Sequence, residues 1–368
     1  MTNTLRKGKA IARAVVRGAR GVTLGFPRRP TDPPRVFYGL LHLPGRNTYA
    51  GGGAIKIQRL SQRWPNRPWR FNVLYLVSSR LPADAEATVR QAQRRGIPLV
   101  WNQNGVAYPA WHGVGWEDTN AVMARLLGDA TYVIYQSEFC RTSADRFLGK
   151  ASTPAEVLYN AVDTTVFAPA PTRPPRPLTL LVGGTQDLEY RLTTALDVLV
   201  EVRRHIPETR MVVAGRLRWT PDERACAAQA ARHVARRAVQ ANVTFVGPYT
   251  QAEAVQIFRS ADILLHGKYN DPSPGLIVEA LACGLPVVYS ESGGVPEIVG
   301  PDAGIGIPAE LSWEREIPPD PAAMARATLE VAERHGAFAA AARRRAVERF
   351  DTAPWIERHR AVFARLRA

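Results

Sequence analysis

The chain has 368 residues and a formal net charge of +15, and its 46% hydrophobic and 22% charged residues are ordinary for a folded soluble protein. This length is enough for two domains of about 150 residues each. The longest apolar runs are far shorter than the about 20 residues that a bilayer-spanning helix needs. We therefore expect two soluble domains and no transmembrane helix.

The positive charge raises the question of a polyanionic partner. Only five of the 48 basic residues are lysine, and the arginines are spread along the whole chain. No RNP, zinc-finger or basic-zipper pattern accompanies them, so we do not expect nucleic acid as a partner. An anionic membrane surface or a phosphorylated substrate explains the charge better.

The N-terminal segment concentrates basic residues. Residues 5–20, LRKGKAIARAVVRGAR, place apolar side chains at roughly helical spacing and carry arginine or lysine at many of the other positions. Two interpretations stay open, a weak membrane-surface helix and a solvated, partly disordered tail. The segment lacks the apolar core of a signal peptide. A weak contact with an anionic membrane is therefore one hypothesis.

The three cysteines, Cys140, Cys226 and Cys283, are scattered and form no CxxC pair. Such spacing predicts neither a disulfide framework nor a zinc site. The three cysteines fit a reducing cytoplasm. A peripheral position at the inner membrane face is a further hypothesis, which is based on the N-terminal segment.

Short apolar runs alternate with longer amphipathic ones after the tail, which is typical of βαβ units with parallel strands. Helical patterns lie between most of the predicted strands. We predict that a first sheet is built from strands at 36–43, 72–78, 98–102, 132–136 and 156–159.

A proline-rich stretch at 168–178, APAPTRPPRPL, interrupts this alternation and predicts a stiff linker. The chain thus divides into a basic tail at 1–33, a first domain at 34–170 and a second domain at 171–350. In the second domain we predict helices at 192–205 and 252–259, and strands at 178–182, 210–214, 243–246, 262–265 and 286–289.

The last segment, 351–368, begins with an Asp-Thr cap and predicts a helix with Trp355, His359, Phe363 and Leu366 on one side. A terminal helix of this kind can pack back across the hinge. Two facing domains make a cleft, and open parallel sheets bind ligands at the carboxyl ends of their strands. The loops that follow strands are therefore the expected place of a site.

The stretch at 270–288, NDPSPGLIVEALACGLPVV, predicts a short helix with clear boundaries. Ser273 can cap the helix and Pro274 suits its first position. Gly284, followed by Pro286, ends it. The helix therefore begins directly after a polar turn that follows a buried strand.

Two carboxylates and the start of this helix suggest a ligand. The backbone amides of Gly275 and Leu276 can bind an anion, since the helix dipole adds about +0.5 charge there. A ligand whose hydroxyls bind Asp271 and Glu279 and whose phosphate binds the helix start would be a nucleotide sugar. The alternative is an ordinary capped helix with a solvated glutamate, because motifs of this length have a known false-positive rate.

Three neighbouring residues extend this candidate site. Gly293 and Gly294, in the turn SESGGVPE after the next strand, can offer further amides. His266 ends the preceding strand beside the acidic pair.

The stretch resembles the motif of retaining GT-B glycosyltransferases of the family 4 (group 1) type. That family has two acidic residues separated by seven, then an "EA-A-GLPVV" run and a "GG-PE" turn. Here these are Asp271 and Glu279, EALACGLPVV and GGVPE. LYNAVDTTVFAP resembles the family's entry to its interdomain linker, and YVIYQSEFCRTSADRFLG resembles one of its βα units. The resemblance covers nearly the whole chain beyond the first thirty residues.

The resemblance implies an α/β, GT-B fold: two facing Rossmann-like parallel-sheet domains with a cleft between them and a C-terminal helix packing back across the hinge. The second domain would bind the nucleotide-sugar donor and the first the acceptor. Glu279 would bind the ribose hydroxyls, and Asp271 would face the transferred sugar. No metal and no other cofactor is implied.

The residues expected to bind the diphosphate, which we call the diphosphate clamp, depart from the family's pattern. The family often has an arginine and a lysine after the first strand of its second domain, where this chain has GGTQDLEYR. That loop offers Gly184 for close approach, Arg191 about one position off, and Thr185 where arginine is common. Arg216 and Lys268 are the candidates to compensate.

Two other positions depart from the family. The first acid is usually glutamate, so Asp271 is one methylene shorter. The histidine often found after the third strand of the first domain is replaced by Asn104, with His112 nearby in WNQNGVAYPAWHG. We assign Asp271, Arg191 and Asn104 to catalysis.

The first domain offers acceptor-binding candidates. Gly52 and Gly53 lie in TYAGGGAIK after the first strand, where their amides allow close approach; a flexible turn is the alternative. Tyr108 and Trp111 suit a sugar ring, which is apolar on one face, and His112 beside them is a further acceptor-binding candidate; core packing of their loop is equally open. Glu138 begins a helix and is either an acceptor ligand or only a partner of the helix dipole.

The sequence therefore predicts transfer of a sugar from a nucleotide-diphosphate sugar to a hydroxyl acceptor, lipid-linked or saccharide, with retention of configuration. The setting would be cell-envelope polysaccharide or glycolipid synthesis. Two alternatives share the architecture or the ligand: a nucleotide-sugar epimerase or phosphorylase, and a non-catalytic sugar or nucleotide binder.

Overall fold

The computed structural model describes residues 33–45, 47–172 and 175–366. The predicted membrane-surface helix at 5–20 lies outside the described residues. None of the described helices is both long and apolar enough to cross a membrane.

The first domain is a five-stranded parallel sheet in the order β1-β2-β3-β4-β5. Strand β2 is buried at all five of its positions, as expected where helices cover both faces of a sheet. The strands are β1 (Val36–Phe37), β2 (Val73–Val77), β3 (Leu99–Gln103), β4 (Tyr132–Tyr135) and β5 (Ala155–Val157), and the helices are α2 (Gly52–Arg63), η1 (Ser78–Arg80), α3 (Ala85–Gln93), α4 (Pro109–His112), α5 (Trp116–Gly128) and α6 (Glu138–Phe147).

The first strand is much shorter than predicted. It ends at Phe37, and Gly39 turns the chain with a φ of +77°, a conformation that glycine adopts without strain. The apolar residues Leu40 and Leu43 lie in the following loop and pack against the core. The apolar run at 36–43 therefore covers the core from a loop instead of extending the sheet.

The second domain is a six-stranded parallel sheet in the order β11-β10-β9-β6-β7-β8. The sequence missed only β11, whose glycines weaken the strand pattern. The strands are β6 (Thr179–Gly183), β7 (Arg210–Ala214), β8 (Val243–Gly247), β9 (Ile263–His266), β10 (Val287–Glu291) and β11 (Gly304–Pro308), and the helices are α7 (Glu189–Arg203), α8 (Glu223–Arg236), η2 (Gln240–Asn242), α9 (Gln251–Arg259), α10 (Gly275–Ala282), α11 (Val295–Val299), α12 (Pro321–Glu333) and α13 (His335–Phe350).

The order of strands reverses between β6 and β9, which are neighbours in the sheet although six elements of chain, α7 to α9, lie between them. Ligands of open parallel sheets bind at such a reversal, outside the carboxyl ends of the strands. The loops after β6 and β9, at 184–188 and 267–274, are therefore placed for binding.

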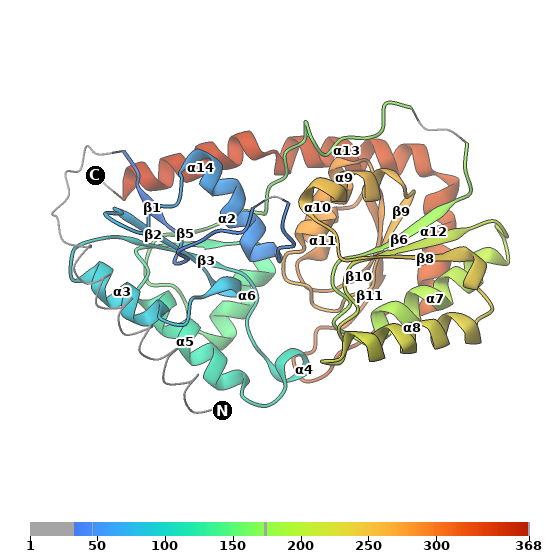
Figure 1. Ribbon diagram of the computed structural model, residues 1–368, viewed down its shortest axis with the longest axis horizontal. Coiled ribbons are helices and arrows are strands. Elements are labelled where there is room, and N and C mark those ends of the chain that lie inside the picture. The colour runs from blue at the N-terminus through green and yellow to red at the C-terminus, as the bar shows by residue number, and fades with distance from the viewer. Residues whose placement is uncertain (1–32, 46, 173–174, 367–368) are drawn as a thin grey trace.

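The C-terminal helix α14 (Thr352–Arg365) packs back on the first domain, as predicted. Figure 1 shows α13 along the second domain and α14 continuing over the first. Asp351 caps α14 by accepting a hydrogen bond from the Ala353 amide at 2.8 Å. Phe363 lies in the core of the first domain, with its ring 4.9 Å from that of Trp64. The last helix thus completes the first domain's core.

His359 holds this helix to the sheet by buried hydrogen bonds. Its Nδ1 lies 2.9 Å from the Trp355 carbonyl oxygen and donates to it, so Nε2 accepts from the Tyr75 hydroxyl at 3.1 Å. Burial lowers the pKa of His359 to about 3. The imidazole is therefore neutral in the folded protein.

We predict that this histidine makes stability depend on pH. Because the folded pKa lies below the unfolded value of about 6.5, the unfolded chain binds the extra proton. The stabilisation is complete above pH 6.5 and falls toward pH 3, by at most about 1.4 kcal/mol per pH unit. Urea unfolding from pH 7.5 to 5 measures it.

The variant His359→Gln is the control, since glutamine keeps a hydrogen-bonding side chain that does not titrate. Its loss of stability between pH 7.5 and 5 should be smaller than that of the unchanged protein. Parallel curves for the two proteins would contradict the assignment.

Candidate functional site

A cavity of about 310 Å³ lies between the two domains, where the carboxyl ends of the strands meet. We call it the interdomain cavity. The predicted site residues that line it are Gly52 and Asn104 from the first domain, and Gly184, Arg191, His266, Lys268, Asp271, Ser273, Gly275, Leu276 and Glu279 from the second. The structure thus brings together residues that are as far as 227 positions apart in the chain.

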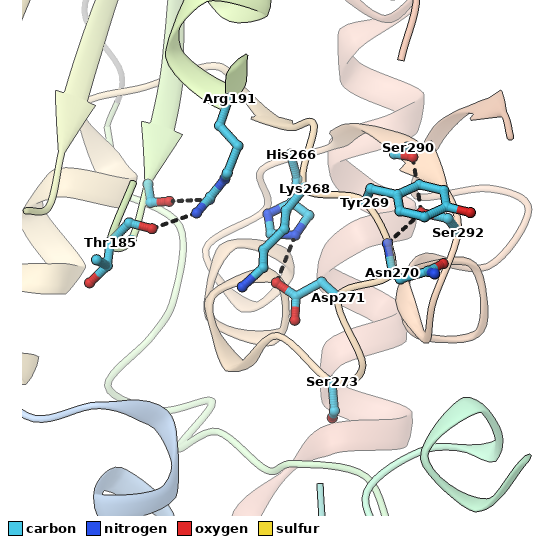
Figure 2. A network of polar contacts seen from close by, with 12 residues as sticks. Thr185, Arg191, His266, Lys268, Tyr269, Asn270, Asp271, Ser273, Ser290 and Ser292 are labelled. Carbon is cyan, nitrogen blue, oxygen red and sulfur yellow. Dashed lines mark hydrogen bonds and ion pairs between the residues drawn. The ribbon is translucent and has the colours of Figure 1, made fainter. Parts of the chain in front are cut away.

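Asp271 lies beside His266 in this cavity (Figure 2), with Oδ2 3.2 Å from Nε2 of the imidazole. Burial alone would raise the pKa of Asp271, but the charges of Lys268 and Arg191 and the contact with His266 outweigh it, so the pKa is well below its usual range. The carboxylate is therefore ionised at neutral pH.

His266 is 2% exposed, and neither of its ring nitrogens makes a geometrically acceptable hydrogen bond within the described residues. Burial lowers its pKa, more than the neighbouring Asp271 raises it. The imidazole is thus neutral, and its Nε2 faces the Asp271 carboxylate.

A cationic pair lies next to this acid. Asp187 accepts from Arg191 Nη1 at 3.0 Å through Oδ1 and from Lys268 Nζ at 3.2 Å through Oδ2. Arg191 also donates to the carbonyl oxygens of Thr185 and Gly183. Lys268 therefore supplies the second cation that the loop after β6 lacks. The sequence reasoning missed Asp187, and the available signal was an acid four residues before Arg191 in the same loop-to-helix segment.

Arg216 lies at the edge of this group. Its guanidinium carbon is 4.2 Å from the ring centroid of Tyr49, and the Tyr49 hydroxyl is 2.8 Å from Thr185 Oγ1. Arg216 is not among the described residues that line the interdomain cavity. Of the two cations expected to compensate in the clamp, the structure brings only Lys268 beside Arg191.

Helix α10 begins at the cavity, but Ser273 does not cap it. The N-cap is Pro274, with no side-chain cap hydrogen bond. Ser273 Oγ instead accepts from Asn160 Nδ2 at 2.9 Å and donates to the carbonyl oxygen of Gln136 at 3.2 Å. The predicted cap is wrong because the hydroxyl has polar partners in the first domain, leaving the helix start to Gly275 and Leu276.

Glu279 is held from the first domain. Arg59 Nη2 donates to its Oε1 at 2.8 Å, and Gln251 Nε2 donates to the same oxygen at 3.3 Å. Burial raises the pKa of Glu279, although Arg59 acts in the opposite direction. No polar partner is recorded for Oε2 within the described residues. One oxygen is thus neutralised across the cleft, and the other remains for a ligand.

A buried lysine also reaches the cavity from helix α2. Lys56 is 4% exposed, and its Nζ donates to Asn102 Oδ1 at 3.0 Å. Burial lowers its pKa well below the usual value. The sequence reasoning passed over it, and the only signal was a lysine within the apolar run AIKIQRL.

Gly293 and Gly294 lie under the loop that carries Asp271, outside the described lining of the interdomain cavity. The Gly294 amide donates to the Asp271 carbonyl oxygen at 2.9 Å, and is therefore engaged by the protein itself. A Cβ at Gly293 would lie 2.5 Å from the same oxygen. These glycines permit close packing that fixes the position of Asp271.

A second cavity, of about 320 Å³, adjoins the first, and we call it the side cavity. Asn104, Lys268 and Asp271 line both cavities. The predicted acceptor residues Tyr108, Trp111 and His112 line the side cavity only.

The two remaining predicted acceptor residues lie elsewhere. Gly53 is not part of either lining, and a Cβ there would lie 2.7 Å from Ser79 Oγ, so its role is close packing of α2 on η1. Glu138 forms an ion pair with Arg141 and is outside both linings. Its amide donates to Glu297 of the second domain at 2.8 Å. Within the described residues, no group of three potential metal ligands occurs.

Comparison with known proteins identifies this architecture. Two facing parallel-sheet domains with a cavity between them form the GT-B fold. Sucrose-phosphate synthase from Thermosynechococcus elongatus superposes with a TM-score of 0.66 at 16% identity, over 92% of this chain and 87% of that one. Anabaena Alr3699/HepE in complex with UDP-glucose gives a TM-score of 0.64 at 18% identity, over 80% and 79% of the two chains.

Residues 165–315 match the family "Glycosyl transferases group 1". Glycogen synthase from Mycobacterium tuberculosis (strain ATCC 25618 / H37Rv) is 26% identical over 251 residues, which are 66% of this chain and 57% of the relative. D-inositol 3-phosphate glycosyltransferase from Mycobacterium tuberculosis (strain F11) is 29% identical over 155 residues, 39% of this chain and 30% of the relative. The chain thus spans little more than half the length of the first of these relatives.

The match over residues 165–315 confirms the group 1 part of the resemblance drawn from the motifs. The predicted GT-B fold, with its C-terminal helix on the first domain, is confirmed as well.

We predict that Arg59 and Glu279 are strongly coupled across the cleft. Their side chains are only 14% and 6% exposed, and removing one partner of a buried pair typically costs about 3–5 kcal/mol because the other charge stays buried. In a double-mutant cycle with Arg59→Ala and Glu279→Gln, the double variant should lose much less stability than the sum of the single variants.

The matched control is the exposed pair Arg125 and Glu86, whose side chains are 58% and 36% exposed. Its coupling should be about 0.2–1 kcal/mol, as for other surface pairs. Equal coupling energies in the two cycles would show that the pair across the cleft carries no special stabilisation.

Proposed function

We propose that this chain transfers a sugar from a nucleotide-diphosphate sugar to a hydroxyl acceptor. The observation that carries the proposal is one cavity whose lining combines a cationic pair, the start of a helix and a carboxylate with one oxygen paired. Arg191 and Lys268 lie at its loop side, and Glu279 lies one turn into α10. The Anabaena protein of the same fold was solved with UDP-glucose, which supports the donor class.

The donor would place each of its parts on a distinct group. Its diphosphate would lie against Arg191, Lys268 and the first amides of α10, since both fixed cations and helix N-termini favour anions. Its ribose hydroxyls would donate to Glu279 Oε2, the oxygen that Arg59 and Gln251 leave open. This arrangement requires no movement of the Arg59 contact.

The proposed reaction retains the anomeric configuration through a front-face route. The bond between the sugar's anomeric carbon and the phosphate oxygen breaks, and a bond to the acceptor oxygen forms on the same face. The acceptor's proton passes to the departing phosphate oxygen. Arg191 and Lys268 would stabilise the charge on the phosphate, where one preorganised donor contributes about 3–4 kcal/mol.

Asp271 would act on the other side of the reacting bond. Its carboxylate is ionised and lies where the two cavities join. A fixed negative charge there would stabilise positive charge that develops on the sugar ring. Asn104, which also lines both cavities, would contact the acceptor hydroxyl. In this proposal amides and side chains neutralise the diphosphate, so transfer would not need a divalent metal and would continue in EDTA.

We predict that Glu279→Ala and Glu279→Gln both weaken binding of the donor. Loss of a charge-assisted hydrogen bond is worth about 1.5–3 kcal/mol, which corresponds to roughly 10- to 100-fold in affinity. The donor is first identified by thermal shift with UDP, GDP, ADP and TDP sugars, since a ligand at a hundredfold excess over its Kd stabilises by about 2.7 kcal/mol.

Glu333→Ala is the matched control, because Glu333 is exposed at the end of α12. It should leave both donor binding and transfer unchanged. Unchanged transfer in the Glu279 variants would count against the assigned role of that residue. Turnover without an acceptor or only with inorganic phosphate would favour the epimerase or phosphorylase instead.

We also propose that the enzyme works in the cytoplasm at the inner membrane face, in synthesis of envelope polysaccharide or glycolipid. The support is the basic, amphipathic pattern of residues 5–20. Deletion of residues 1–25 should abolish co-sedimentation with vesicles that contain phosphatidylglycerol, and vesicles of phosphatidylcholine alone are the control. Unchanged sedimentation of the shortened chain would reject the membrane contact.

A further inference from the structure

The side cavity has a different chemistry from the interdomain cavity. Of the described residues that line it, only Lys268 and Asp271 carry a formal charge, and no arginine is among them. This is notable in a chain with a net charge of +15. Both charged residues lie on the boundary with the interdomain cavity, since they line both.

Lys268 is engaged on the interdomain side, where Asp187 contacts it and where the proposed donor diphosphate would lie. Its Nζ is 3.2 Å from Asp187 Oδ2, and Asp271 adds a second carboxylate close by. Beyond this boundary the polar groups of the side cavity are hydroxyls, amides and the His112 imidazole, which contacts Thr119 Oγ1 at 3.0 Å. A phosphate or carboxylate inside the side cavity would thus lose its hydration without a fixed cation beside it, which is costly.

The rest of the lining suits an uncharged ring. Trp111 is 42% exposed, and Lys268 Nζ is 4.4 Å from its ring centroid. Tyr108 is held by edge-to-face contact with Trp313 at 5.0 Å between ring centroids. Val106 and Met123 add apolar surface, while Ser143 and Asn270 add hydrogen-bonding groups. A pyranose has this same combination of apolar faces and hydroxylated edges.

We propose that the side cavity binds the acceptor as a neutral saccharide, with a ring on Trp111, and excludes acceptors that carry a phosphate on that ring. This inference rests on the proposed function and names its acceptor class. The cavity of about 320 Å³ is at the lower end of the range for small-molecule sites, about 300–1,000 Å³. Its junction at Asp271 and Asn104 brings an acceptor hydroxyl to the place where the donor sugar would lie.

The test uses the full chain with the donor that thermal shift identifies. Each neutral p-nitrophenyl glycoside of glucose, galactose, mannose and N-acetylglucosamine is compared with its 6-phosphate as acceptor. We expect transfer to at least one neutral glycoside and at least tenfold lower kcat/KM for its phosphorylated counterpart. Transfer only to phosphorylated acceptors, or to none while donor is bound and hydrolysed, would overturn the proposal.

Trp111→Ala gives the second measurement. It should raise KM for the neutral acceptor about tenfold, the equivalent of about 1.4 kcal/mol, and change donor affinity much less, through the lost contact with Lys268 alone. Trp111→Phe should recover part of the loss. Trp69→Ala is the control, since Trp69 is 44% exposed and lies outside both linings. Equal KM values for Trp111→Ala and Trp69→Ala would contradict stacking on Trp111.

These experiments also distinguish failure of the proposed function from failure of the acceptor class alone. If no nucleotide sugar binds or is consumed, the proposed function fails and the acceptor class fails with it. If the donor binds and is consumed but the neutral glycosides are not used, only the acceptor class fails.

Discussion

The site depends on the contact between residues 271–273 of the second domain and the strand ends of the first. Ser137 Oγ donates to the Pro272 carbonyl oxygen at 2.6 Å, and Asn160 binds Ser273. Within the second domain, the Gly294 amide donates a hydrogen bond to the Asp271 carbonyl oxygen. Leaving a buried polar group unpaired costs free energy. The loop therefore has little freedom to shift without breaking these hydrogen bonds. This contact therefore fixes how the second domain's cations lie relative to the first-domain residues that line the side cavity.

Charge balance explains why the cavity can receive an anion. Asp187 bridges Arg191 and Lys268, and Asp271 lies beside them. Two carboxylates thus keep two cations in place while limiting their mutual repulsion. A bound diphosphate would therefore meet cations that Asp187 has already oriented. Preorganisation of this kind lowers the cost of binding.

The sequence predicted most of the fold because parallel strands buried on both faces leave strong apolar runs, and β7 matches its prediction at both ends. It predicted Asp271, Glu279 and the start of α10 because these lie within one short motif. It could not predict Arg59 or Lys56. Arg59 meets Glu279 across 220 residues of chain, and local spacing carries no information about such a pair. The Ser273 cap was wrong for the same reason, since its partners lie in the other domain.

The buried charges around the interdomain cavity are poorly explained by stability alone. Lys56 is nearly inaccessible, and the pair of Arg59 and Glu279 is only slightly exposed. Replacing a buried ion pair with apolar residues of similar volume is often neutral or stabilising, because desolvation offsets the attraction. The other buried side chains of α10, from Ile277 to Ala282, are apolar and pack in the core of the second domain. A carboxylate with one oxygen neutralised and the other free instead fits a hydroxyl ligand, which would pair the remaining oxygen and remove the cost of leaving it buried.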